Sequence, residues 1–110
     1  MAVSVKSSGN QTATLTTEHT LLDTTDAGVY QGFIDLTNLA NGDTLEVRVY
    51  VKANSSATLS VVFAVSLKDA PTADALVLVT PPLMSAVEWK MTIKQTAGTG
   101  RAFQWGVFSA

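Results

Sequence analysis

The stretch TLEVRVYVK, residues 44–52, alternates apolar and polar side chains without a break. Its apolar positions are Leu45, Val47, Val49 and Val51, and its polar positions are Glu46, Arg48, Tyr50 and Lys52. Successive side chains of a β-strand point to opposite faces, so this pattern predicts a strand with one face in a core and the other in solvent. Half-buried strands of this kind are typical of antiparallel sheets, and the stretch therefore favours an antiparallel β-protein.

The same alternation recurs along the chain from about Val29 onward. It predicts strands at 29–36, 58–67, 74–80, 86–94 and 101–108, with a further strand around 19–23. Segment 74–80 is apolar at both sets of positions, so we expect both of its faces to be covered. The row predicted to face the core in segment 58–67 is Leu59, Val61, Phe63, Val65 and Leu67. Clusters of Gly, Asn, Asp and Pro separate the segments and explain why the strands end there.

A chain of 110 residues with six to eight short strands predicts one all-β domain. We expect an antiparallel β-sandwich with a jelly-roll-like topology, and an immunoglobulin-like sandwich is the alternative. A helix over 83–93 competes with the strand at 86–94, because Leu83, Val87 and Met91 are spaced four apart. The β-branched residues and the strict alternation in this segment favour the strand.

The first 20 residues include eight Ser or Thr and few apolar residues. This composition predicts a flexible N-terminal arm at 1–17, followed by the sandwich domain at 18–110. Val3 and Val5 alternate with polar neighbours, so the arm is expected to add itself as a strand to a sheet edge of a partner. An edge strand of the same domain is the alternative.

Composition excludes several classes of partner and site. Net charge is −2, so the chain offers no basic field for nucleic acid or for an anionic membrane. Charged residues make up 15% and hydrophobic residues 46%, which favours surface buried between subunits and hence a homo-oligomer. The absence of cysteine excludes disulfides and thiolate metal sites. No apolar run is long enough for a signal peptide or a membrane span, so we expect synthesis and folding in a cytoplasm.

The stretch KQTAGTGRAFQW, residues 94–105, is the one place that suggests a phosphate-binding loop. Gly98 and Gly100 begin a G-x-G-x-x-G pattern, but Phe103 stands in place of the third glycine and a strand follows instead of a helix. The stretch therefore predicts a hairpin turn with Lys94 and Arg101 near its mouth. The strand after this turn is expected to return to the core through Phe103, Trp105 and Val107.

No other constellation predicts catalysis or metal binding. The single histidine, His19, is expected to be an ordinary rim residue, and Asp23 to Asp26 lack the acidic spacing of a calcium loop. A carboxylate pair on one sheet face stays open, with Asp35, Glu46 and Glu88 as its candidates, although outward carboxylates usually pair with neighbouring cations. We therefore predict a non-enzymatic protein that needs no metal or cofactor.

The phrases VYQGFIDLTNLANGDTLEVRVYVKA, VTPP and KQTAGTGRAFQW resemble small all-β proteins encoded among the virion structural genes of tailed bacteriophages. In size and character the chain is similar to their capsid decoration, or cement, proteins. This resemblance covers about residues 29–108. It implies a jelly-roll-like sandwich, often trimeric, that binds the major capsid protein on the outer surface of an assembled head and stabilises it. It also implies synthesis in the cytoplasm of a bacterial host.

Interfaces favour aromatic and arginine anchors, so we predict that contacts form on the outward row of residues 44–52. The predicted interface consists of Glu46, Arg48, Tyr50 and Lys52, with Arg101 and Phe108 nearby and Val3 and Val5 from the arm. A phage fibre or carbohydrate-binding module that recognises a host surface is the alternative function. Its aromatic platforms would be Tyr30, Tyr50 and Phe108.

Overall fold

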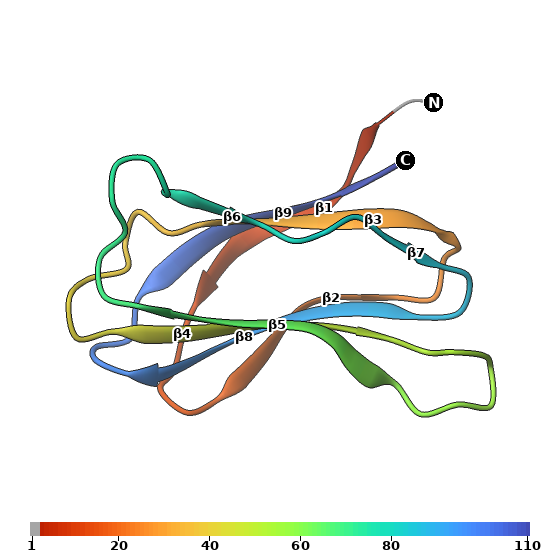
Figure 1. The fold of residues 1–110 in the computed structure, drawn as a ribbon, viewed down its shortest axis with the longest axis horizontal. Coiled ribbons are helices and arrows are strands. Elements are labelled where there is room, and N and C mark those ends of the chain that lie inside the picture. The colour runs from red at the N-terminus through yellow and green to blue at the C-terminus, as the bar shows by residue number, and fades with distance from the viewer. Residues whose placement is uncertain (1–2) are drawn as a thin grey trace.

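The structure is a computed structural model that describes residues 3–110, and this part of the chain folds into two antiparallel β-sheets packed face to face (Figure 1). Sheet A has the order β1-β9-β3-β6, with β7 also paired to β3, and sheet B has the order β2-β8-β4-β5. The strands are β1 (Ser4–Thr12), β2 (Glu18–Thr24), β3 (Gly28–Asp35), β4 (Thr44–Val51), β5 (Ser60–Lys68), β6 (Val77–Val79), β7 (Leu83–Ser85), β8 (Trp89–Ala97) and β9 (Ala102–Ser109). The predicted all-β antiparallel sandwich is confirmed.

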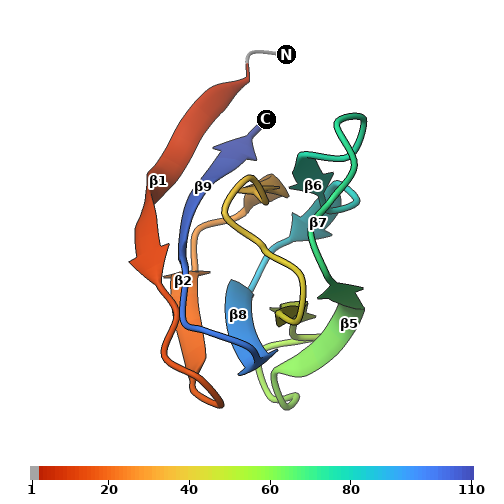
Figure 2. The same cartoon turned by 90° about the vertical axis from the view of Figure 1, so that its left-hand side faces the viewer.

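Strand pairing is nested around the connection between β4 and β5. β4 pairs with β5, β3 with both β6 and β7, β2 with β8, and β1 with β9. The chain therefore doubles back on itself, and the doubled chain wraps so that β1, β2, β3 and β4 lie alternately in sheets A and B. Figure 2 shows β1 and β2 along one side of the sandwich and β5, β6 and β7 along the other.

The core lies between the two sheets and is built from the inward rows that alternation predicts. β4 and β8 supply the sheet B half, and β3 and β9 supply the sheet A half. Fully burying each large apolar side chain stabilises the fold by about 1.5–3 kcal/mol, so these rows hold the sheets together. The helix considered over 83–93 does not form, because β7 and the start of β8 occupy that segment. The largest fully buried side chains include Trp89, Tyr30, Phe103, Ile34, Leu45, Met91 and Ile93.

The N-terminal segment is part of the sandwich over residues 4–12. There β1 pairs with β9 from Ser4 opposite Ser109 to Thr12 opposite Ala102, with one irregularity between Val5 and Ser7. The edge-strand alternative therefore describes residues 4–12, and the flexibility predicted for the arm at 1–17 is not confirmed. Residues 1–2 of that predicted arm lie outside the described residues.

Segment 74–80 corrects one sequence prediction. Only Val77–Val79 forms a strand, β6, and it lies at the edge of sheet A rather than in its middle. The side chains of Val77 and Val79 are 52% and 43% exposed. The prediction that both faces of this segment are covered is wrong, because sheet B packs on one side of β6 and, within residues 3–110, no layer packs on the other.

A bulge corrects the predicted core row of β5. Val49 pairs with Phe63, but the next residue of β4, Tyr50, pairs with Val61, so Val62 is an extra residue in the strand. An extra residue reverses the alternation beyond it. Val61 is therefore exposed, whereas Phe63 and the two core-facing residues after it keep the predicted orientation and pack against the core.

In β3 the even-numbered residues from Tyr30 to Ile34 face the core, so the prediction that Tyr30 is an exposed aromatic platform is wrong. Tyr30 is buried, its ring lies 5.4 Å from that of Trp89, and its hydroxyl donates to the carbonyl of Asp26 at 2.7 Å. Phe33 lies half-exposed on the outer face of sheet A. Since Gln31 and Asp35 share the parity of Phe33, polar neighbours mark this row as the outer one.

The turn after β8 is not a hairpin. β8 belongs to sheet B and β9 to sheet A, so residues 98–101 cross from one sheet to the other at one end of the sandwich. The strand after the crossing does return to the core: Phe103 and Val107 are buried and Trp105 packs against them.

Candidate functional site

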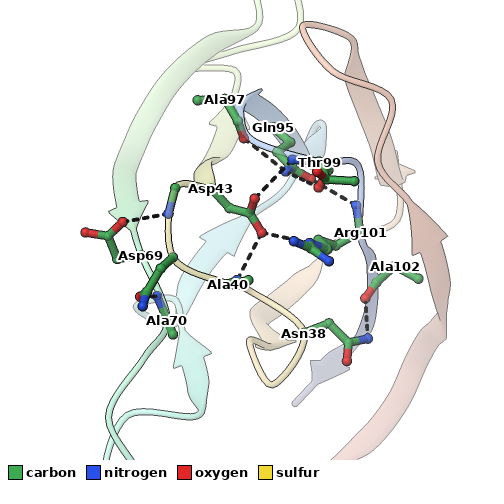
Figure 3. A network of polar contacts seen from close by, with 12 residues as sticks. Asn38, Ala40, Asp43, Asp69, Ala70, Gln95, Ala97, Thr99, Arg101 and Ala102 are labelled. Atoms are coloured by element: carbon green, nitrogen blue, oxygen red, sulfur yellow. Dashed lines mark hydrogen bonds and ion pairs between the residues drawn. The ribbon is translucent and has the colours of Figure 1, made fainter.

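The conspicuous glycines and arginine of residues 94–105 belong to a polar end cluster, which we define as Asp43, Gln95, Arg101 and the backbone groups that they bind (Figure 3). The Asp43 side chain is 1% exposed. Its carboxylate accepts hydrogen bonds from the Ala40 N–H at 2.9 Å, the Thr99 N–H at 3.1 Å and Arg101 Nε at 2.9 Å. Burial alone raises the pKa of Asp43, but these donors outweigh it and hold the pKa below its usual value.

Gln95 continues the inward row of β8 with a polar side chain in place of an apolar one. Its side-chain amide donates to the carbonyls of Ala97 at 3.0 Å and Thr99 at 2.7 Å, and its oxygen accepts from the Arg101 N–H at 3.1 Å. Three backbone groups that would otherwise be unpaired at the end of the sandwich are thereby satisfied. The cluster thus covers the end of the core at the connection formed by residues 97–101.

Gly98 is required by this arrangement. Its φ of +90° lies in the left-handed region, and a Cβ there would overlap the Asp43 carboxylate and lie 2.8 Å from the Asp43 Cα. The backbone amides and the arginine that suggested an anion site already bind a carboxylate of the chain itself. The cluster is therefore structural, and it does not present its donors to a ligand.

The outer face of sheet B forms a charged face, which we define as Glu18, Glu46, Arg48, Tyr50, Lys52, Glu88, Lys90 and Thr92. Arg48 lies 3.3 Å from Glu46 and 3.8 Å from Glu18, and Lys52 lies 3.4 Å from Glu88. Glu18 also accepts hydrogen bonds from the hydroxyls of Tyr50 at 2.5 Å and Thr92 at 2.6 Å. Burial raises the pKa of Glu18, but these hydrogen bonds and Arg48 lower it by more. The charges of this face are satisfied within the molecule.

Tyr50 is a poor platform for a sugar ring. The Lys90 ammonium lies over its ring at 5.2 Å from the centroid, so a cation of the chain occupies the face on which a sugar would stack. Tyr30, the second predicted platform, is buried in the core. Of the three predicted platforms, Phe108 alone faces outward without a cation of the described chain over its ring.

The candidate acidic residues do not assemble into one site. Asp35 lies on the outer face of sheet A, whereas Glu46 and Glu88 belong to the sheet B side, so the three do not meet on one sheet face. Asp23 does lie beside Glu88: burial, followed by the Glu88 carboxylate, raises the pKa of Asp23. Within residues 3–110, no group of three or more His, Cys, Asp or Glu side chains gathers at metal-binding distances.

His19 has a local structural role. Its Nε2 accepts a hydrogen bond from the Thr14 N–H at 3.0 Å, and its Nδ1 lies 3.3 Å from the Gln11 side-chain amide. The ring is half-buried and ties β2 to the connection from β1. This placement agrees with the rim position expected from the sequence.

The outer face of sheet A is different in character. We define its apolar face as Val5, Phe33, Val77, Val79, Met84 and Phe108, which the strand registers place on one side: Val5 is opposite Phe108, Val79 opposite Phe33, and Met84 opposite Val29. Val5 is 61% exposed and Met84 is 80% exposed. Apolar side chains from five strands therefore face solvent together, which is the pattern of an interaction surface rather than of scattered exposed residues.

A shallow hollow of about 410 Å³ lies on this apolar face. Phe33 and Phe108 form an edge-to-face pair with ring centroids 4.9 Å apart, and Gly106 between them leaves the sheet open. Among the described residues that line the hollow, Asp35 alone is charged. Its carboxylate accepts hydrogen bonds from the Thr37 N–H at 2.9 Å and the Thr37 hydroxyl at 2.5 Å, which lower the pKa of Asp35.

The structure divides the predicted interface residues among three places. Glu46, Arg48, Tyr50 and Lys52 lie together on the charged face, as their spacing requires. Arg101 lies in the polar end cluster, away from that row, because the chain crosses to sheet A after it. Val5 and Phe108 face each other on the apolar face, and Val3 precedes β1 with 72% of its surface exposed.

Sequence reasoning missed most of the apolar face. Val77 and Val79 belong to a segment that was expected to be covered on both faces, Phe33 was not predicted as a surface residue, and Met84 lies in β7, a strand that was not predicted. The one available signal was that Phe33 alternates with the polar residues Gln31 and Asp35, which places it on their outward face.

No protein-family model matches the chain, and neither the curated proteins nor the solved structures include a match to it. Among the residues that the structure describes, no helix is long and apolar enough to cross a membrane. The resemblance to capsid decoration proteins thus remains a prediction.

Proposed function

We propose that this protein is a non-enzymatic virion structural protein that binds the outside of an assembled phage capsid and stabilises it, as a decoration or cement protein does. The observation that carries the proposal is the apolar face of sheet A. Its side chains are exposed or half-exposed and lie on one side of one sheet, and four of them line a shallow hollow in whose described lining Asp35 is the one charged residue. Such a surface fits another protein better than it fits a small polar substrate.

The proposed fold within this function is a jelly roll. The nested pairing supports it, since four strands on one limb pair in reverse order with the strands of the other limb, and the doubled chain alternates between the two sheets. Jelly rolls occur in viral capsid and lectin domains, among others, so the fold is compatible with a virion protein and does not by itself assign one. Within this topology β1 is the outermost strand of the first limb, and any arm motion would have to detach it from β9.

The proposed partner is the major capsid protein, bound through the apolar face. A sheet face of this kind can cover a complementary apolar surface, and Phe33 and Phe108 are the aromatic anchors that interfaces favour. We include self-association in the proposal, because several linked copies that bind equivalent capsid sites gain avidity of about 10²–10⁴ over one copy. The resemblance implies a trimer. The place of action is the outer capsid surface, after synthesis in the bacterial host cytoplasm.

Co-sedimentation tests this function directly. Empty heads are assembled from the major capsid protein encoded in the same gene cluster, and binding of wild-type protein is compared with Val77→Glu. The matched control is Leu15→Glu, an aliphatic-to-acidic change at an exposed position in the connection between β1 and β2, off the apolar face.

We expect wild type and the control to sediment with heads and Val77→Glu to bind at least tenfold more weakly, because a carboxylate would be buried without a partner. Equal binding by all three would contradict the assignment of the face. Failure of the wild type to bind heads at any concentration, or the absence of any capsid gene near this one, would contradict the function itself.

The carbohydrate-binding alternative retains little support. Of its three predicted platforms, Tyr30 is buried and the ring of Tyr50 is covered by Lys90, which leaves Phe108 in an edge-to-face pair with Phe33. Binding to a glycan array that Val77→Glu abolishes would reverse this preference.

A further inference from the structure

The two sides of the sandwich differ in how their edge strands are protected. On one side, β1 carries a bulge between Val5 and Ser7, and Lys6 within it pairs with Asp26 at 2.5 Å. The neighbouring edge strand, β2, has its own irregularity between Thr20 and Leu22 and carries acidic residues at Glu18 and Asp23. Bulges and charges are the usual means by which natural sheets prevent edge-to-edge pairing.

The edge of sheet B on the other side lacks most of this protection. β5 (Ser60–Lys68) contains no proline and no charged residue before Lys68. Its bulge at Val62 lies near its start, so the run from Phe63 to Lys68 is regular. It pairs with β4 on one side, and in the part of the chain that the structure describes, no backbone hydrogen bond joins its other side to a loop. The backbone groups along this edge are therefore available to another strand.

The inward row of β5 is only partly covered by its own domain. Phe63, Val65 and Leu67 pack against the core but stay half-buried, whereas the equivalent row of β4 is completely buried. The outward side of the same run carries the small residues Ala64 and Ser66, beside a hollow of about 240 Å³. A strand added at this edge would extend both the sheet and the incomplete apolar row.

We propose that the strand added here is β5 of a second copy of this chain, paired antiparallel across a two-fold axis at Val65. This register places Phe63 of each copy opposite Leu67 of the other and Val65 opposite itself, so the half-buried apolar row becomes continuous. Ala64 stands opposite Ser66, and the terminal Lys68 stands opposite Val62. The proposal does not depend on capsid binding.

The neutral side-chain pattern of the run fits a second copy as the occupant. An edge strand with charges along its length would meet like charges when paired with itself, but the regular run of β5 is neutral up to Lys68, whose partner in this register is apolar. Matching directly opposite side chains in this way stabilises antiparallel pairs, and like charges would destabilise them. A single pair of edges buries less than the standard 800 Å² per partner, so we expect a dissociation constant on the order of 10 μM.

This pairing joins copies in twos and therefore differs from the trimer that the family resemblance implies. A two-fold interface uses the same surface on both copies, whereas a ring of three needs two different surfaces. The β5 edge thus predicts dimers, or even-numbered assemblies built from them, in the free protein.

The test uses two double variants of the full chain. Ala64→Glu with Ser66→Glu places like charges opposite each other twice across the proposed axis. Ala64→Glu with Ser66→Lys places opposite charges at the same positions and serves as the matched control. Within each copy, position 64 is opposite Arg48, so Ala64→Glu is tolerated in both variants. Position 66 is opposite Glu46, so Ser66→Lys is favoured and Ser66→Glu disfavoured within a copy, and the melting temperatures of the monomers measure this intramolecular difference separately from dimerisation. Thermal unfolding at low protein concentration checks that both fold.

Sedimentation velocity and native mass spectrometry from 1 to 200 μM give the dissociation constants. We expect a wild-type dimer, a like-charge variant whose dissociation constant is at least about tenfold higher, and a control that dimerises as well as wild type or better. A wild type that is monomeric at 200 μM, a trimer, or two variants that change the dissociation constant equally would overturn the proposal. Head binding by Val77→Glu reports separately on the proposed function.

Discussion

The polar end cluster and the apolar face of sheet A are opposite in how they use their side chains. In the cluster, Asp43 and Gln95 are buried and their polar atoms bind backbone groups of the same chain. On the apolar face, Phe33, Val77 and Phe108 are exposed or half-exposed, and nothing within the described chain covers them. The residues that are chemically conspicuous in the sequence maintain the fold, and inconspicuous aliphatic and aromatic residues form the surface available to a partner.

The cluster also brings together two segments that are far apart in the sequence and that contributed to the family resemblance. LTNLANGDTLE and KQTAGTGRAF meet in space, through Asp43 with Arg101 and through the Asn38 side-chain amide, which donates to the Ala102 carbonyl at 2.8 Å. The Asp69 carboxylate accepts the Gly42 N–H at 2.9 Å and brings a third connection to the same end. Four measurements of stability compare the cluster with the apolar face.

The largest expected loss of stability is for Asp43→Ala. It leaves two backbone N–H groups and Arg101 without their acceptor at a nearly dry site, so we expect a loss of about 3–4 kcal/mol in the free energy of unfolding. The same change beside the apolar face, Asp35→Ala, removes only the solvent-exposed acceptor of two Thr37 hydrogen bonds. It should lower the free energy of unfolding by about 0.5–1 kcal/mol. Urea unfolding of both variants gives the comparison. Equal losses would show that Asp43 is not a special support of the fold.

Gly98→Ala should be the next most costly change. Both Gly98 and Gly42 have positive φ values, +90° and +91°, but a Cβ at Gly42 has nothing within 4 Å. Strain alone should cost Gly42→Ala about 1 kcal/mol, whereas overlap with Asp43 should raise the cost of Gly98→Ala to about 2–3 kcal/mol. Thermal unfolding of the pair isolates the overlap. If Gly42→Ala were the more harmful change, the packing of Asp43 against Gly98 would be refuted.

Acidification should weaken the cluster in a defined direction. The pKa of Asp43 is lowered in the folded protein, so its contribution to stability is complete above the pKa of the unfolded chain, at about pH 4. It is lost as the pH falls through the lower folded value. We expect Asp43→Asn to show a shallower decrease in melting temperature than wild type between pH 5 and pH 2. Identical slopes would contradict the lowered pKa.

The smallest stability effect should come from the apolar face. Val77→Glu introduces a charge at a position that is already 52% exposed but lies opposite Asp35, so the free energy of unfolding should fall by less than about 1 kcal/mol. The same substitution in the core, Val49→Glu, should abolish folding, because Val49 is fully buried. A large loss from Val77→Glu would indicate that β6 supports the fold and is not free to serve a partner.

Much of the fold could be predicted from period-two alternation. β2, β3, β4, β5, β8 and β9 were located to within about three residues at each end, because one face of each is apolar. Alternation does not say which sheet a strand joins. The crossing at Gly98 was therefore mistaken for a hairpin, and only the pairing of β8 with β4 and of β9 with β3 reveals it.

The candidate surface was harder to predict for a related physical reason. An apolar residue on a strand is expected to be covered by default. Val77, Val79 and Phe33 were therefore not predicted as surface residues. Whether an apolar row is covered depends on the layer packed against it, which is a tertiary property. The row from Glu46 to Lys52 lies on one outer face as its alternation predicts, and its ion pairs form within the molecule.

Hydroxyl-radical footprinting of the protein with and without empty heads tests the central claim most directly, because the two outer faces carry their own aromatic probes. Phe33 and Phe108 report on the apolar face of sheet A, and Tyr50 reports on the charged face of sheet B. We expect labelling of Phe33 and Phe108 to fall on binding while that of Tyr50 stays unchanged. Protection of Tyr50 with continued labelling of Phe33 and Phe108 would contradict the account and return the interface to the charged face.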